Sequence, residues 1–141
     1  MQVRDVESGF VIKLSRGEKV IASLTGFCEK RSIKGGVFQA VGAVEDTQIG
    51  YYDFKKREYF FKTIPDIMEV ASLNGNVALV DGKPLLHTHA VLSKTDESLG
   101  TAGAHIKEAT VAVTLEVYLI PFAVPLARAY DDDTGLKLLN L

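Results

Sequence analysis

The sequence predicts an α+β fold, in which one early α-helix accompanies a mostly antiparallel β-sheet or partial barrel within a single domain, residues 1–141. Three observations predict it. Apolar residues alternate with polar ones over most of the chain, as in β-strands. One early segment has the helical period instead, and short groups of turn residues separate the segments. With 141 residues, of which 47% are hydrophobic, the chain is long enough to bury one core.

The first expected elements are a strand and the helix. In residues 9–18, every second residue from Phe10 to Leu14 is apolar, which predicts a strand. The helix is expected within residues 17–36, and Gly35-Gly36 is expected to end it. Its apolar side chains would form one buried stripe, made of Val20, Ile21, Leu24, Phe27 and Cys28.

The rest of the chain is expected to be almost all strand. Residues 37–44 and 47–54 would be neighbouring strands joined by a short turn at Glu45-Asp46. A long strand, residues 67–80, would be kinked at Asn74-Gly75-Asn76. The remaining strands are expected at residues 59–64, 85–92, 109–120 and 125–130.

Charge and composition argue against several classes of protein. The net charge is −2 and the longest basic run is Lys55-Lys56-Arg57, whereas a protein that binds DNA phosphates normally has a basic excess. The single cysteine, Cys28, cannot form an intrachain disulfide and is expected to be a small buried hydrophobe. The start is polar and no apolar run approaches the roughly 20 residues of a membrane span. We therefore expect a cytoplasmic protein with no membrane partner.

All three histidines lie between Leu85 and His105. Side chains at positions i and i+2 of a strand point the same way, so His87 and His89 are expected to share a face. The glycine-rich segment that follows is expected to form a turn that brings His105 back over this strand. Three neutral imidazoles suit a divalent metal such as zinc and leave a coordination position open. Spacing alone leaves a second interpretation open, in which these are unrelated surface or turn histidines.

Two carboxylates on expected strands are flanked by apolar residues. Glu69 and Glu116 would be costly to bury unless paired or linked to a metal. Each is therefore a candidate fourth ligand, hydrogen-bond partner of a ligand histidine, or general base. Each is also compatible with facing solvent or with an ordinary salt bridge to a neighbour.

Several motifs in combination resemble the plant-and-prokaryote-conserved (PPC) domain family. They are the strand "MEVASLNG", the His-x-His strand "LLHTHAVL" and the glycine-rich segment "GTAGAH", and the resemblance covers roughly residues 9–130. One departure is Gly103-Ala104, where family members often have two glycines. Plant members add AT-hooks with an Arg-Gly-Arg-Pro core. Here Arg16-Gly17 is followed by Glu18, which has the wrong charge for the minor groove.

The resemblance implies an α+β fold assembled as a homotrimer, with a metal-capable cleft near the subunit boundary. The family's histidines carry over to His87, His89 and His105, and its strand glutamate carries over to Glu69. The fold is also similar to that of acetolactate decarboxylase, whose metal is held by three histidines. That distant similarity supports a metal site more than it supports a reaction.

Two functions from different classes follow. The first is a stand-alone trimeric module with a divalent metal, expected to be zinc, and a small anionic ligand at the histidines. It would act through protein association, with DNA as an indirect partner at most. The second is a metal-dependent lyase or hydrolase acting on a small oxo-acid, in which the metal polarises a substrate oxygen and Glu69 is the catalytic group that moves the proton.

Overall fold

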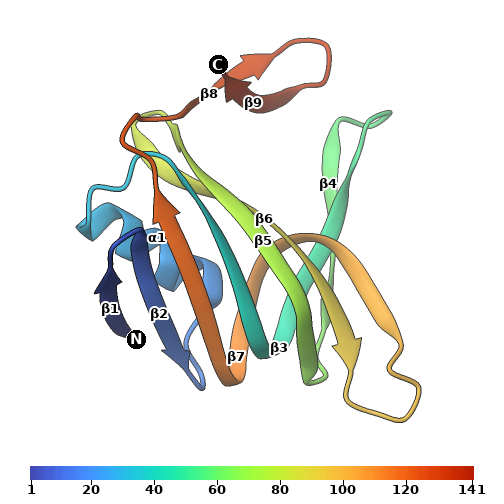
Figure 1. Cartoon of the computed structure of the whole chain (residues 1–141). Helices are drawn as coiled ribbons and strands as arrows, with labels where there is room; N and C mark the ends of the chain where they lie inside the picture. The colour runs from blue at the N-terminus through green and yellow to red at the C-terminus, as the bar shows by residue number, and fades with distance from the viewer.

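A computed structural model of the protein describes residues 1–141 and contains one helix and nine strands (Figure 1). The predicted combination of one early helix with a mostly antiparallel sheet is confirmed. The elements are β1 (Gln2–Val6), β2 (Gly9–Ser15), α1 (Val20–Lys30), β3 (Gly36–Asp53), β4 (Glu58–Ile64), β5 (Met68–Val80), β6 (Lys83–Lys94), β7 (Thr101–Pro121), β8 (Ala127–Asp131) and β9 (Leu136–Asn140).

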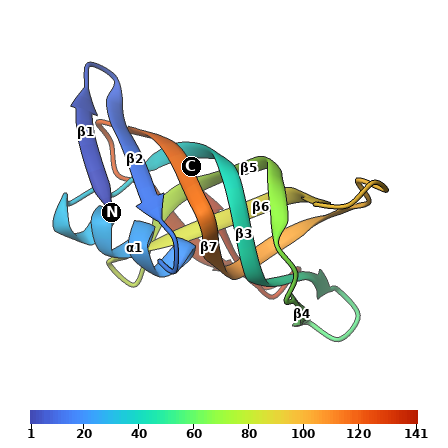
Figure 2. The same cartoon turned by 90° about the horizontal axis from the view of Figure 1, so that it is seen from below.

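All nine strands belong to one strongly curved sheet. Four of them pair in a closed ring, because β3 pairs with β5 and β7, and β6 pairs with the same two strands. Every pairing is antiparallel except a single parallel bridge from Leu79 of β5 to Ala127 of β8. Figure 2 shows α1 beside β2 and β7, at the opposite end of the molecule from the loop between β6 and β7. The helix thus covers one end of the core and lies far from the loop between β6 and β7.

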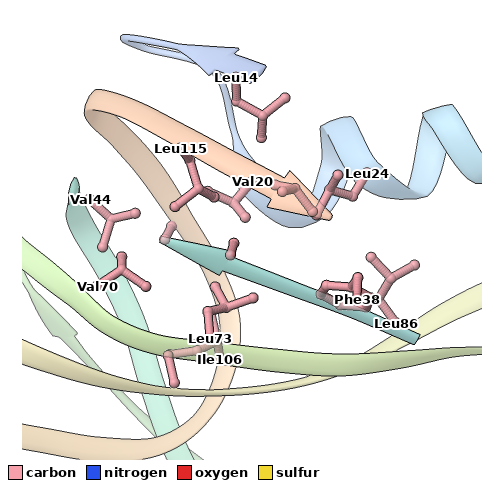
Figure 3. Close-up of a cluster of buried hydrophobic side chains, with 14 of the residues drawn as sticks. Leu14, Val20, Leu24, Phe38, Val44, Val70, Leu73, Leu86, Ile106 and Leu115 are labelled. Carbon is pink, nitrogen blue, oxygen red and sulfur yellow. The ribbon is translucent and has the colours of Figure 1, made fainter. Parts of the chain in front are cut away.

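The core forms where the helix stripe meets the inner faces of the strands. Leu24 of α1, Leu14 of β2 and Leu115 of β7 are fully buried and belong to the same hydrophobic cluster as Leu73 of β5 (Figure 3). At the start of the helix, the backbone N–H groups of Ile21 and Ala22 have no carbonyl partner within the helix itself. They donate to the Glu108 carboxylate of β7 instead, at 2.8 and 3.1 Å.

The helix ends earlier than expected, so the prediction that Gly35-Gly36 ends it is wrong. The backbone N–H of Ser32 donates to the Glu29 carbonyl, and that of Ile33 donates to the Cys28 carbonyl. This is the Schellman arrangement, in which the residue after the cap adopts a left-handed conformation. Ser32 occupies that position with φ of 54°.

The expected turn at Glu45-Asp46 is also wrong, because β3 is one strand of 18 residues. Its pairing with β7 shifts register between Glu45 and Gln48, and Asp46 has φ of 48°. An extra residue in one strand bends the strand without ending it. The two halves of β3 can therefore follow the curvature of the ring.

The kink expected at Asn74-Gly75-Asn76 is not present in the pairing of β5. These residues pair in regular register with β3 and β6, and the register shift lies between Val70 and Ser72. The structure also contains two strands that the sequence does not predict, the polar β1 and the short C-terminal β9.

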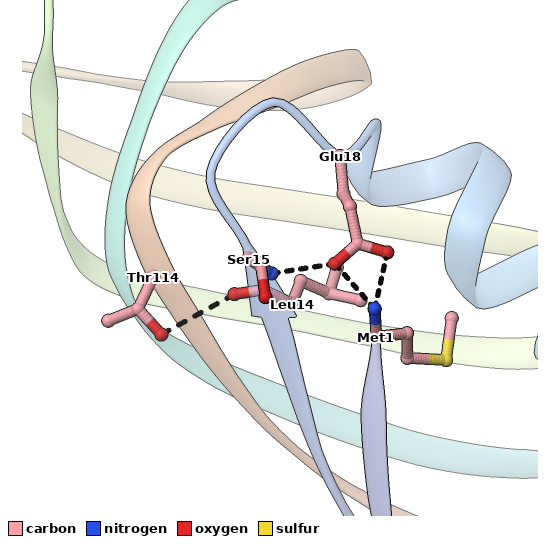
Figure 4. Close-up of polar contacts among 5 residues, drawn as sticks. All are labelled: Met1, Leu14, Ser15, Glu18 and Thr114. Atoms are coloured by element: carbon pink, nitrogen blue, oxygen red, sulfur yellow. Dashed lines mark hydrogen bonds and ion pairs between the residues drawn. The ribbon is translucent and has the colours of Figure 1, made fainter.

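Polar contacts attach β1 and β2 to the rest of the fold (Figure 4). The terminal ammonium of Met1 lies 2.8 Å from the Glu18 carboxylate, which also accepts from the backbone N–H of Ser15 at 2.7 Å. These two interactions lower the pKa of Glu18. The Thr114 hydroxyl of β7 donates to the Leu14 carbonyl at 3.4 Å.

The only helix, α1, falls short of the length and apolar character that a membrane crossing requires.

Candidate metal centre

The three histidines lie together on the outer face of the sheet. His87 and His89 alternate along β6 with Leu86, Thr88 and Ala90, which are buried. The Nε2 atoms of His87 and His89 are 3.1 Å apart, and Nδ1 of His105 is 3.3 Å from Nε2 of His89. One nitrogen from each ring lies within 4.8 Å of the others. The prediction that three imidazoles converge on one point is confirmed.

His105 reaches the other two histidines by strand pairing, which corrects the expectation of a turn. Its segment already belongs to β7, and His105 lies directly opposite His89 in the β6–β7 ladder. Close packing explains why residue 103 is a glycine, because a Cβ at this position would lie 3.2 Å from the Val91 side chain. The methyl group of Ala104 packs against the core, on the face of the strand opposite His105.

Burial keeps the imidazoles of His87 and His105 neutral at neutral pH. The pKa of His87 is lowered by burial first, and then by the charges of Arg128 and His89. The pKa of His105 is lowered to about 4, again by burial first, and then by His87, His89 and Arg128. A neutral imidazole has the lone pair that a metal needs, whereas a protonated one does not.

The two nitrogen separations that involve His89 fit a tetrahedral metal. Bonds of about 2.0–2.1 Å from zinc to histidine nitrogen place two ligand nitrogens roughly 3.3 Å apart. The separations of 3.1 Å and 3.3 Å around His89 match this spacing. Three imidazoles would therefore hold such an ion and leave its fourth position open, where the ion could polarise a ligand oxygen.

An aromatic wall and a pocket adjoin the histidines. The rings of Tyr59 and Phe61, both on β4, have centroids 5.1 and 6.1 Å from that of His105. A pocket of about 280 Å³ lies between these rings, His87 and Arg128. Arg128 lies on β8, and Figure 1 shows that the β8–β9 hairpin and the β3–β4 hairpin project at the same end of the molecule.

Sequence reasoning missed Arg128 and Tyr59 as parts of this region. Arg128 lies on β8 and Tyr59 lies on β4, and neither has a spacing that relates it to the histidines. The only sequence signal at Arg128 is a charged residue between two alanines in an expected strand.

The structure does not bring the two candidate carboxylates to the histidines within one chain. Glu69 is exposed on β5 and pairs with Ser93, four residues beyond His89 and therefore roughly 13 Å away. Glu116 is exposed near the other end of β7, opposite Val41. The catalytic role of Glu69 stays a prediction that a single chain does not satisfy.

Cys28 is not part of the site. It is fully buried in the core, and burial raises the pKa of its thiol to about 12. The expectation of a small buried hydrophobe is confirmed.

Comparison with known proteins agrees with the fold and with the histidine cluster. The model of the Plants and Prokaryotes Conserved (PCC) domain matches residues 1–123. No curated protein matches the chain in sequence. A solved metal-containing protein from Archaeoglobus fulgidus is 35% identical, with both chains covered completely and a TM-score of 0.86.

Two further solved structures resemble the chain. A plant- and prokaryote-conserved protein from Pyrococcus horikoshii is 28% identical, with a TM-score of 0.84, and the match covers 93% of this chain and 90% of that one. A candidate DNA-binding protein from Bacteroides thetaiotaomicron has a TM-score of 0.93 at 19% identity, with 99% and 96% of the two chains covered. At 19% identity, the likeness to the Bacteroides thetaiotaomicron protein shows a shared fold alone.

Proposed function

Because this chain belongs to the Plants and Prokaryotes Conserved domain family, we propose that it is a cytoplasmic, homotrimeric module that binds zinc and a small anionic ligand. The metal is held by His87, His89 and His105. The observation that carries the proposal is the convergence of three imidazoles from two paired strands. The likeness to a metal-containing protein at 35% identity supports it.

The outer face of the sheet supports the trimer. Cross-strand rows connect the histidines to apolar residues, since His87 lies in one row with Asn76, Val37 and Ile120. Both apolar members of this row are exposed, as is Tyr118 of the next row. Exposed apolar surface that continues from a ligand site favours association. We assign this face, called here the histidine face, to the contact between subunits.

DNA is at most an indirect partner in this proposal. Two solved structures that resemble the chain are described as candidate DNA-binding proteins, yet this sequence has a net charge of −2 and no AT-hook motif. Binding through phosphates needs a basic surface. A gel-shift assay at physiological salt should show no retardation at high micromolar protein. Retardation at low micromolar protein would contradict the proposal that DNA is at most an indirect partner.

Metal content tests the proposal. Untagged wild-type protein should contain about one metal ion per chain, and His87→Ala/His89→Ala protein close to none, because the ligands are removed. Val91→Ala changes the next residue on the same face of β6 and should keep the full metal content. Equal metal content in the wild type and the double variant would contradict the site.

The second candidate function is a metal-dependent lyase or hydrolase acting on a small oxo-acid. The pocket of about 280 Å³ beside the histidines favours it, because this volume suits a small substrate. Since Glu69 lies apart from the histidines in one chain, a neighbouring subunit would have to supply this carboxylate. Glu69→Gln should then abolish turnover while metal content stays unchanged. Turnover that survives Glu69→Gln would remove Glu69 from the reaction.

A further inference from the structure

We propose that Arg128 forms an anion subsite, which holds one carboxylate of a small ligand whose other oxygen donors reach the metal at the histidines. This inference rests on the proposed metal site and deepens it, because it states the charge that the ligand must have. The match to the family model ends at residue 123, before the hairpin that carries Arg128.

Arg128 shares a pocket with two of the histidines. His87, His105 and Arg128 line the same pocket of about 280 Å³, together with the aromatic ring of Tyr59. Arg128 donates to Asn76, and Asn76 pairs directly with His87 across β5 and β6. A ligand that contacts the guanidinium therefore has two of the three proposed metal ligands, His87 and His105, within the same pocket.

The guanidinium is held by neutral groups and has no counter-charge. Its Nη2 donates to Oδ1 of Asn76 at 2.7 Å, and its Nη1 donates to the Lys137 carbonyl at 3.2 Å. Its Nε is buried and has no hydrogen-bond partner. The three ion pairs of the chain involve other cations, namely the terminal amine, Arg31 and Lys137.

A half-buried, unpaired charge is costly, and an anion would remove the cost. Burial lowers the pKa of Arg128, which shows that the charged form loses solvation here. A guanidinium favours planar oxyanions, because its N–H groups match the two oxygens of a carboxylate. Charge and geometry therefore favour a carboxylate over a neutral ligand.

The hairpin that presents Arg128 is attached to the wall of the pocket. The Tyr52 hydroxyl donates to the Thr134 carbonyl at 2.8 Å, and Nη2 of Arg57 donates to the Asp133 carbonyl at 3.1 Å. Both donors come from the β3–β4 hairpin region, which also carries Tyr59. These contacts hold the β8–β9 hairpin over the pocket, so the guanidinium has a defined position before a ligand arrives.

The test uses untagged protein loaded with cobalt, whose visible absorption reports changes in metal coordination. Oxalate, malonate and succinate are titrated separately, with malonamide as the neutral counterpart of malonate. At least one dianion should change the spectrum of the wild type, and malonamide should not. Arg128→Gln should weaken that dianion about tenfold or more, because a charge-assisted hydrogen bond is lost.

Two further variants separate a specific subsite from a general effect of charge. Arg128→Lys keeps the charge but loses the planar fork, so we expect intermediate affinity. Lys55→Gln removes a positive charge from the neighbouring β3–β4 turn, where the side chain is exposed and does not line the pocket, so affinity should stay within about twofold. The melting temperature of each variant verifies that it is folded.

The outcomes are distinct. If cobalt binds and Arg128→Gln binds the dianions as tightly as the wild type, the subsite is wrong while the metal site stands. Equal losses in Arg128→Gln and Lys55→Gln, or no response of the wild type to any dianion, also overturn the subsite. If the wild type binds no cobalt, the proposed metal site fails, and this inference fails with it.

Discussion

His89 and His105 lie directly opposite each other on β6 and β7, with Nε2 of His89 3.3 Å from Nδ1 of His105. Strand pairing therefore brings the third imidazole to the pair on β6. Paired side chains on one face of a sheet lie close together whether or not an ion is bound. The site is consequently built into the fold, and changes to the sheet beneath it should affect both stability and metal binding.

Two glycine substitutions should have opposite effects on stability. At Gly75 of β5, a Cβ would lie 2.3 Å from the buried Phe38 ring and 2.6 Å from the His87 carbonyl. Gly75→Ala should therefore lower the free energy of unfolding by about 1–3 kcal/mol. At the exposed Gly26 of α1 a Cβ meets nothing within 4 Å, so Gly26→Ala should raise it by about 1 kcal/mol.

Chemical denaturation measures both effects, and metal content adds a second readout. Gly75→Ala should also reduce metal affinity, because it displaces the backbone of His87, whereas Gly26→Ala should not. Equal stability of the two variants would contradict the packing described around Phe38.

Metal-free protein should lose stability as pH falls from 6.5 towards 4. Over this range the unfolded chain protonates His105, whose ordinary pKa is 6.5, while the folded chain does not, because its pKa is about 4. The unfolded state then binds more protons than the folded state, so the free energy of unfolding decreases as the pH decreases. Above pH 6.5 His105 no longer makes the free energy of unfolding depend on pH.

His105→Gln isolates this contribution. The two proteins differ in no other titratable group, so urea denaturation at several pH values should give a shallower dependence of the free energy of unfolding on pH for the variant. Identical slopes for His105→Gln and wild-type protein would show that His105 is not buried as a neutral group.

Cys28 should be inert in the folded protein. Burial, and secondarily the charge of Glu29, raises its pKa from 9.0 to about 12, so almost no thiolate is present at pH 8. A thiol reagent should label Cys28 only as fast as the protein unfolds, and denaturant should accelerate labelling. Fast labelling of the native protein would place Cys28 outside the core.

Assembly should depend on the histidine face. Light scattering should give three times the 15.4 kDa mass of one chain for the wild type. Ile120→Asp should dissociate the trimer, because a charge would be buried in the contact. Val6→Asp is the control, since Val6 is 43% exposed and Ile120 is 46% exposed, but Val6 lies on β1 at the sheet edge. A monomeric wild type at micromolar concentration would contradict the proposal.

Much of the fold could be predicted because alternation persists through the strands of the ring. Prediction failed where one residue pattern fits two local structures. Glu45-Asp46 is polar enough for a turn, but Asp46 also tolerates the left-handed conformation of an irregular strand. Only the pairing of β3 with β7 on both sides of this point decides between them.

The part of the site that depends on the geometry of a single strand could be predicted from the sequence. His87 and His89 share a face by strand alternation, so their proximity follows from sequence. The convergence of His105 was expected, but the register that creates it could not be read from glycine content. Arg128 could not be predicted at all, because its position depends on the C-terminal hairpin folding back to Asn76.

Diffraction from crystals of metal-loaded, untagged protein, recorded at the absorption edge of the metal, tests the central claim most directly. The proposal predicts one anomalous peak per chain, within about 2.0–2.1 Å of one nitrogen each from His87, His89 and His105. A metal bound at other side chains, or histidines that remain free of metal in fully loaded protein, would contradict it.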